Sequence, residues 1–266
     1  MLKKLRILLD NEIDPAFAQR AEFIFKILEK EKPKRVLDAG CGRGFYPNAV
    51  SLYSFPREIV GIDINSEYLK QAKDQISDKR VKLLKKSIYS TDFPDNYFDL
   101  VICSEVLEHL TNEKKALGEI SRILKKNGTL LITVPGYNFP FLWDPINWIL
   151  MRFFKTHVNK NIWFLAGIWA GHERLYEVND LGEKIKNAGF SVLKINGVIS
   201  FCWPFSHFIL YGLGKNIVER LNIRSFSRFQ FKKNNFNYLL ARLFSIPTKF
   251  ITGDSSVDII AQARKN

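Results

Sequence analysis

The stretch VLDAGCGRGFY, residues 36–46, decides the fold, because it joins the end of an apolar strand to a glycine-rich turn. Asp38 stands at the carboxyl end of that strand. Three glycines follow at alternate positions, and these are Gly40, Gly42 and Gly44. Glycine has no Cβ, so the backbone can turn sharply here and approach a ligand before a helix begins. Dinucleotide-binding turns use the similar order G-x-G-x-x-G, whereas the order here is D-x-G-x-G-x-G, and a packing turn without any ligand is the alternative.

The length and composition limit the number of domains, the cellular compartment and the kinds of partner that the protein can have. The 266 residues, 46% of them apolar, suffice for one large α/β domain with elaborations or for two small domains. The three cysteines are widely spaced and odd in number, which argues against a disulfide framework and predicts a cytoplasmic protein. A net charge of +13 predicts an anionic partner, which is a nucleic acid, an anionic membrane surface or an acidic small molecule.

A second strand, EIVGID at residues 58–63, ends in another acid. Asp63 lies about 20 residues beyond the glycines, the distance at which a carboxylate on the neighbouring parallel strand accepts hydrogen bonds from ribose hydroxyls. Asn65 is expected to cap a helix that runs to about Gln75. A lone strand-end aspartate is more often a helix cap than a ligand, but together with the glycine turn we expect ribose binding.

The alternation of strands and helices continues regularly to Pro135. VKLLKKS and DLVICS predict two more strands, the second of which brings Ser104 and Glu105 to its carboxyl end. We expect a helix with an apolar face through Leu124, closed by residues 125–128, and then the strand TLLITVP. This order predicts a doubly wound, parallel α/β sheet.

The glycine turn and the segment EVLEHL, residues 105–110, resemble the type 11 family of class I S-adenosylmethionine-dependent methyltransferases. The resemblance implies a Rossmann-like, mostly parallel seven-stranded sheet whose last strand is antiparallel. It also implies S-adenosylmethionine as cofactor. The expected cofactor-binding residues are Asp38, Gly40, Gly42, Gly44, Asp63, Ile64, Ser87, Ile88, Ser104 and Glu105. Ser87 departs from the family, which usually has an aspartate there to accept from the adenine amino group, and a neutral hydroxyl is a weaker acceptor.

Two insertions interrupt the scaffold. We expect an N-terminal helix and the cofactor-binding part in residues 1–135, a first cap insertion in 136–170 and a late helix–strand unit in 171–198. A second, basic and aromatic cap insertion is expected in 199–253 and the final core strand in 254–266. All five tryptophans lie in the insertions: Trp143, Trp148, Trp163, Trp169 and Trp203.

The second insertion mixes cations with phenylalanines. Its cations are Lys215, Arg220, Arg224, Arg228, Lys232, Lys233, Arg242 and Lys249. Such a mixture suits an anionic membrane surface, with aromatic rings at the headgroup level, or stacked nucleic-acid bases. A lid packed on the sheet, with its charges solvated, is the alternative.

Methyl transfer from a sulfonium needs mainly alignment of the acceptor and exclusion of water, and a base only if the acceptor is protonated. The candidates are His172, Glu173 and Tyr176, because GHERLY leads from the first insertion back into the scaffold. The histidines and cysteines show no paired ligand spacing, so no metal is expected.

Three functions remain open. The first is methyl transfer to an apolar or lipid-linked small-molecule acceptor, which enters under an aromatic cap of a cytoplasmic or peripherally membrane-bound protein. The second is a methyltransferase acting on RNA or another nucleic acid, although CSEV lacks the Asn/Asp-Pro-Pro-aromatic run of enzymes that methylate base amino groups. The third is a cofactor-binding partner protein without catalysis. The sequence does not define the oligomeric state.

Overall fold

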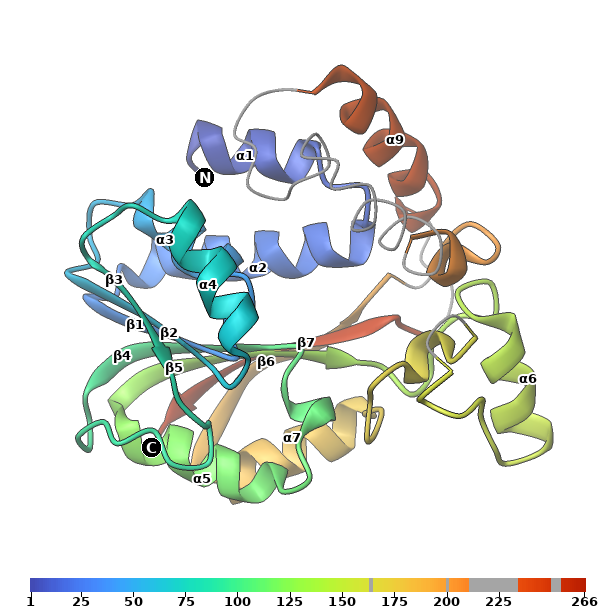
Figure 1. Cartoon of the computed structure of the whole chain (residues 1–266). Coiled ribbons are helices and arrows are strands. Elements are labelled where there is room, and N and C mark those ends of the chain that lie inside the picture. The colour runs from blue at the N-terminus through green and yellow to red at the C-terminus, as the bar shows by residue number, and fades with distance from the viewer. Residues whose placement is uncertain (163–164, 200, 211–233, 250–254) are drawn as a thin grey trace. The chain divides into compact units, whose positions relative to one another are not determined.

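The computed structural model describes residues 1–162, 165–199, 201–210, 234–249 and 255–266. Within these ranges one seven-stranded sheet has the order β3-β2-β1-β4-β5-β7-β6 (Figure 1). Its strands are β1 (Arg35–Ala39), β2 (Glu58–Asp63), β3 (Val81–Lys85), β4 (Phe98–Ser104), β5 (Leu124–Pro135), β6 (Phe190–Val198) and β7 (Asp258–Lys265). The Rossmann-like, mostly parallel seven-stranded sheet is therefore confirmed.

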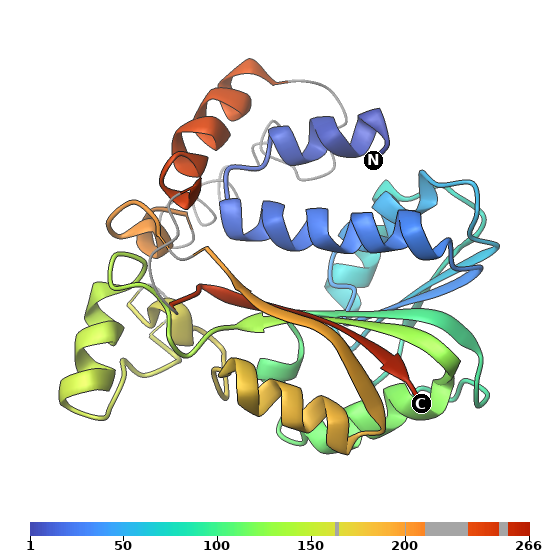
Figure 2. The same ribbon diagram turned by 180° about the vertical axis from the view of Figure 1, so that it is seen from behind.

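The strands β1 to β5 are parallel, and β7 runs against its neighbours. Val36, Leu37 and Asp38 of β1 each pair with both β2 and β4 in parallel register. At the other end of the sheet, the N–H of Asn266 donates to the carbonyl of Gly189, so the end of β7 meets the start of β6. Figure 2 shows the reversed direction of the β7 arrow. Because parallel neighbours bring their carboxyl ends to one edge, Asp38 and Asp63 end up at the same edge.

Helices cover both faces of the sheet. The helices are α1 (Lys3–Asp10), α2 (Pro15–Glu31), α3 (Phe45–Ser51), α4 (Ser66–Gln75), α5 (Glu113–Ile123), α6 (Pro145–Phe153), α7 (Val178–Asn187) and α9 (Asn235–Ser245). α3 and α4 lie on one face, and α5 and α7 lie on the other (Figures 1 and 2). The expected cap of α4 is present, since the Asn65 side chain accepts from the N–H groups of Glu67 and Tyr68.

The chain divides into two compact, interleaved units. Unit 1 comprises Met1–Glu22, Pro135–Glu177 and Gly197–Ile259, and unit 2 comprises Phe23–Val134, Val178–Asn196 and Ile260–Asn266. Unit 2 holds the glycine turn and most of the sheet. Unit 1 contains the aromatic-rich insertions.

Aromatic side chains of the first insertion build the core of unit 1. Phe139 and Trp143 are buried with Met151 and Ile168 in one cluster, against which Trp148 and Trp169 pack. Trp203 is partly exposed and donates from its indole nitrogen to the carbonyl of Leu243. Trp163 and the cations Lys215, Arg220, Arg224, Arg228, Lys232 and Lys233 lie outside the described residues, as does the Lys249 side chain.

A buried polar network holds α6 in this core. The Asp144 carboxylate accepts from the N–H of Asn147 at 3.1 Å, which caps α6, and from the N–H of Ile168 at 2.9 Å. The Asn147 amide donates to Asp144 and to the carbonyl of Ala166. Gly167 has φ +59°, and a Cβ there would lie 1.9 Å from Asp144 Oδ2. Only glycine therefore fits between the two segments.

The prediction from the sequence was wrong about one boundary and missed one helix. α5 ends at Ile123, and β5 already begins at Leu124, so residues 125–128 belong to the strand rather than to a helix end. Asn127 adopts φ +61°, and the pairing with β4 shifts between Phe98 and Leu100, which is a bulge. The predicted N-terminal helix is α2, and the shorter helix α1 before it was not predicted.

Candidate cofactor site and catalytic residues

The glycine turn between β1 and α3 is held in left-handed conformations, with φ of +84° at Gly40, +50° at Gly42 and +85° at Gly44. A Cβ at Gly40 would lie 2.4 Å from Val106, and one at Gly44 would lie 2.8 Å from Ala72. These two glycines therefore serve the packing of the protein itself. A Cβ at Gly42 would meet no atom of the described residues within 4 Å, so within this part of the chain the backbone borders open space at this position.

Asp63 links the turn to the next strand. Its Oδ2 accepts from the N–H of Gly42 at 2.8 Å, and its Oδ1 accepts from the N–H of Asn65 at 2.8 Å. A carboxylate oxygen has two lone pairs, so each oxygen of Asp63 keeps one acceptor position besides these bonds. The carboxylate therefore orients the turn and can still accept from a ligand.

Asp38 is the buried acid under the turn. Burial raises the pKa of its carboxyl well above the ordinary value, and the nearby charge of Asp63 raises this pKa further. Its Oδ2 is buried without a hydrogen-bond partner among the described residues. A buried oxygen without a partner is costly, and a cation or donor brought by a ligand would relieve that cost.

The ends of β4 and β5 carry a hydrogen-bonded cluster. Ser104 Oγ lies 3.3 Å from the Tyr46 hydroxyl and 2.8 Å from Thr133 Oγ1, and Thr133 donates to Glu105 at 3.0 Å. Glu105 has φ +55°, which is rare outside glycine and concentrates at functional sites. Tyr46 and Thr133 were not predicted. Tyr46 is the last residue of the stretch that decides the fold, but only the folded sheet brings it to Ser104.

The loop after β3 holds the predicted adenine contacts. Ser87 Oγ accepts from the N–H of Tyr89 at 3.2 Å, so part of its hydrogen-bonding capacity serves the loop itself. Ile88 is buried, whereas Ile64, directly after Asp63, is 72% exposed. An apolar side chain this exposed gains from burial against a ligand, although single exposed apolar residues are common.

All ten predicted cofactor-binding residues lie in unit 2, at or just after the carboxyl ends of β1, β2, β3 and β4. The three candidate bases belong to unit 1. Glu173 forms an ion pair with Lys160 at 2.5 Å, and the Tyr176 side chain is fully buried. His172 is half-buried, and its backbone N–H donates to the carbonyl of Trp169. Their catalytic role stays a prediction.

No helix in the described ranges is both long and apolar enough to cross a bilayer.

The segment that contains the glycine turn and Asp63 is also the segment that matches known proteins. A family model described as a methyltransferase domain matches residues 37–132. An uncharacterized protein of Methanocaldococcus jannaschii is 37% identical over 131 residues, which cover 48% of this chain and 52% of the relative. The malonyl-[acyl-carrier protein] O-methyltransferase of Legionella pneumophila is 28% identical over 144 residues, which cover 48% and 51%. The chain therefore spans about half the length of the curated relatives it matches.

A solved structure is similar over nearly the whole chain. The [4+2]-cyclase SpnF has a TM-score of 0.58 at 19% identity, covering 96% of this chain and 85% of that chain. At this identity the likeness shows the fold alone, and the neighbour's name as a cyclase shows that the fold does not determine the reaction. The domain match over residues 37–132 contains the glycine turn, Asp63 and the ends of β3 and β4. With this match and this sheet, residues 37–132 are similar to a methyltransferase domain and carry its fold.

Proposed function

We propose that the protein binds S-adenosylmethionine at the carboxyl edge of its sheet and transfers the methyl group to an apolar or lipid-linked small molecule. The observation that carries the first part is Gly42, whose backbone borders open space while Gly40 and Gly44 are packed against the protein. A ligand can approach the main chain only where no side chain intervenes. The buried Oδ2 of Asp38, which has no hydrogen-bond partner in the described ranges, fits the same ligand, because the cofactor is cationic at its sulfonium and its amino group.

The chain's own residues would bind the cofactor and orient it toward the acceptor. When bound, S-adenosylmethionine supplies an activated methyl group, so alignment and a dry site are the protein's main tasks. Asp63 accepts from the ribose hydroxyls with its remaining lone pairs, and Ile64 and Ile88 cover the adenine. Asp38 offers its buried carboxyl to the positive end of the ligand.

For an acceptor that carries a proton, His172 is our choice of base. Glu173 is engaged with Lys160, and Tyr176 is fully buried. An imidazole changes charge near neutral pH, which suits proton removal at the pH of most cells.

The apolar acceptor is supported by a pocket within unit 1. Its volume is about 320 Å³, at the lower end of the range for small-molecule sites. Phe139, Phe141, Leu142 and Trp148 line it, and Arg152 stands over the Trp148 ring at 4.4 Å. We infer that this pocket takes up the apolar part of the acceptor, and that Arg152 accommodates a polar or anionic group.

Exposed apolar side chains on two helices of unit 1 support contact with a membrane surface. On α9 the exposed residues Phe236, Leu239 and Leu243 recur at helical spacing, and the exposed Ile246 follows at the C-cap. On α6 they are Ile146, Ile149 and Phe153, followed by Phe154. The exposed cations Arg152, Lys155 and Arg242 stand among them and complement an anionic bilayer. A lipid-linked acceptor would be reached from such a surface.

The test is a labelling experiment. The protein is incubated with S-adenosylmethionine carrying a labelled methyl group and, in parallel, with total lipid extract, RNA and protein of the host. We expect label in the lipid fraction. Label in RNA instead would contradict the acceptor class, and cofactor binding with no label in any fraction would contradict catalysis.

One variant and its matched control test whether this pocket binds the acceptor. Phe141 is partly exposed at the rim, so Phe141→Ser should raise the KM for the acceptor while leaving the affinity for S-adenosylmethionine unchanged. Leu193→Ser, at an exposed residue of β6, is the matched control and should change neither. Equal effects of the two variants would refute the pocket as the acceptor site.

A further inference from the structure

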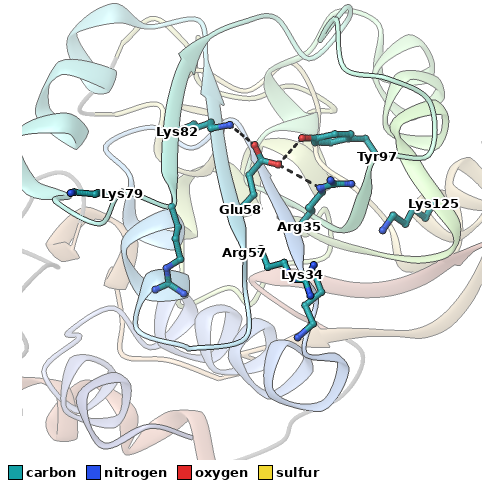
Figure 3. Close-up of a pocket in the computed structure, with 9 residues that line it drawn as sticks. Lys34, Arg35, Arg57, Glu58, Lys79, Lys82, Tyr97 and Lys125 are labelled. Carbon is teal, nitrogen blue, oxygen red and sulfur yellow. Dashed lines mark hydrogen bonds and ion pairs between the residues drawn. The ribbon is translucent and has the colours of Figure 1, made fainter.

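A second pocket lies in unit 2 at the edge where the strands begin. Arg35 is the first residue of β1, Glu58 is the first residue of β2, and Tyr97 directly precedes β4. These residues line a cavity of about 590 Å³, shown in Figure 3. Because β1 to β5 are parallel, this edge is opposite to the one that carries Asp38 and Asp63, so the pocket is distinct from the proposed cofactor site.

The lining is strongly cationic. Seven of the nine lining residues are lysine or arginine, and Glu58 is the one acid among these nine. Two further acids neutralise lining cations from nearby, since Asp78 pairs with Arg80 and Asp99 pairs with Lys125. With these three carboxylates counted against the seven cations, a surplus of four positive charges remains.

Some of these cations form the fixed frame of the pocket. Arg80 donates to both oxygens of Asp78 and to three backbone carbonyls, at Ser51, Tyr53 and Pro56. This bonding ties the segment before β2 to the segment before β3. The planar guanidinium, with its donors all directed at acceptors, holds that geometry better than a flexible ammonium would.

Glu58 forms the other part of the frame. It accepts from Lys82 at 2.7 Å and from the Tyr97 hydroxyl at 2.6 Å, and the Arg35 guanidinium lies 3.6 Å away (Figure 3). Burial alone would raise the pKa of Glu58, but the hydrogen bonds from Lys82 and Tyr97 keep it below the ordinary value. Glu58 is thus a structural anion, already shared between two cations.

Three lining cations stand apart from this frame. Lys34, Arg57 and Lys79 are exposed, and none of them forms an ion pair with an acid in the described ranges. Each precedes a strand of the same edge by one or two residues, so the folded sheet gathers them around one concavity. Neighbouring cations without counter-charges repel one another and lower the stability of the fold, whereas a bound anion would offset that repulsion.

We propose that this pocket binds a small ligand with two or more linked phosphate groups. Phosphate oxygens are the acceptors that arginine and lysine recognise best, and a surplus of several charges spread over a concave surface suits a ligand with several charges of its own. The pocket thereby gives this chain a second ligand besides the proposed methyl donor.

Other anionic partners fit this lining less well. A single-stranded nucleic acid needs aromatic faces on which its bases stack. The Tyr97 ring is already covered by the Arg35 guanidinium at 4.4 Å and stacks against Phe93. An anionic membrane needs apolar side chains that enter the interface, and none of the nine described residues that line this pocket is aliphatic.

The test is calorimetric titration of the full-length protein with sodium tripolyphosphate. The test variant replaces the three unpaired cations with glutamine, as Lys34→Gln, Arg57→Gln and Lys79→Gln. The control variant makes the same change of charge at three exposed lysines of unit 2 that do not line the pocket, as Lys70→Gln, Lys114→Gln and Lys186→Gln. Circular dichroism and thermal melting establish that both variants are folded.

We expect binding of one tripolyphosphate per chain, weakened by added salt. The test variant should bind at least tenfold more weakly, and the control variant should bind within about twofold of the unchanged protein. Absence of binding, or an equal loss in both variants, would overturn the proposal. A 12-nucleotide RNA or phosphatidic acid vesicles that bind at least tenfold more tightly than tripolyphosphate, through the same three cations, would also overturn it.

Discussion

Replacement of Gly42 by alanine separates ligand binding from packing. A Cβ at this position meets no atom within 4 Å in the part of the chain that the structure describes, so the cost to the folded protein is that of a left-handed φ of +50°. For an L-residue this conformation costs ~1–2 kcal/mol, of which ~0.4–1 kcal/mol is offset because alanine has less freedom than glycine when unfolded. The net loss of stability is about 1 kcal/mol. The added methyl group occupies the space beside the turn, so we expect affinity for S-adenosylmethionine to fall at least tenfold.

Two further glycines are the controls. Gly44→Ala should destabilise the protein more than Gly42→Ala, because its Cβ would lie 2.8 Å from both Ala72 and Ile76. Gly118, within α5, also has open space around it but an ordinary helical backbone, so Gly118→Ala should stabilise by ~0.5–1 kcal/mol. Its affinity for the cofactor should not change.

The measurements are urea denaturation for stability and titration calorimetry with S-adenosylmethionine and S-adenosylhomocysteine for affinity. If the Gly42→Ala protein is folded and binds both ligands as tightly as the unchanged protein, the glycine turn is not the place where the cofactor approaches the backbone. The same result would remove the main support for the proposed function.

Three other predictions concern buried groups. Arg20→Met should lower the free energy of unfolding by ~3–5 kcal/mol in urea denaturation, because it removes the guanidinium that pairs with the buried Asp258 carboxylate at 2.5 Å; a loss below ~1 kcal/mol would contradict the burial of this pair. Gly167→Ala should cost more than ~3 kcal/mol, since its Cβ would collide with Asp144, and unchanged thermal melting would contradict the packing of unit 1. Asp38 keeps its proton to higher pH than an ordinary aspartate because its pKa is raised, and a cationic ligand favours the carboxylate. Binding of S-adenosylmethionine should therefore release a proton and strengthen with rising pH, as calorimetry in buffers of different ionisation enthalpy can measure. Asp38→Asn should abolish this release, and persistence of the release in the variant would assign it to another group.

Short-range signals made much of the scaffold predictable. The order of strands, the glycine turn and the Asn65 cap each depend on residues within a few positions of one another. Asp63 was predictable over a longer distance only because adjacent parallel strands end at one edge. Those signals were enough to predict a doubly wound, parallel sheet, whereas the antiparallel last strand and the adenine contacts at Ser87 and Ile88 were expected from the family resemblance.

Contacts between distant segments could not be predicted. Ser104 meets Thr133, which lies 29 positions later, and Arg80 meets carbonyls up to 29 positions earlier. The bulge at Asn127 depends on the pairing of β5 with β4, which local sequence does not encode. The cationic pocket at the edge where the strands begin could not be predicted either, because its lysines and arginines are scattered through the sequence and gather only when the strands align.

The hydrogen bonds of the cluster at the ends of β4 and β5 all run in one direction. Thr133 gives its only hydroxyl proton to Glu105, so Ser104 must donate to Thr133, and Tyr46 must then donate to Ser104. The Glu105 carboxylate thus aligns three hydroxyl groups, whose hydrogens all point along the series toward Glu105. A molecule that reaches the Ser104 and Thr133 hydroxyls would therefore meet oxygens that accept, which suits a group that brings its own proton or positive charge.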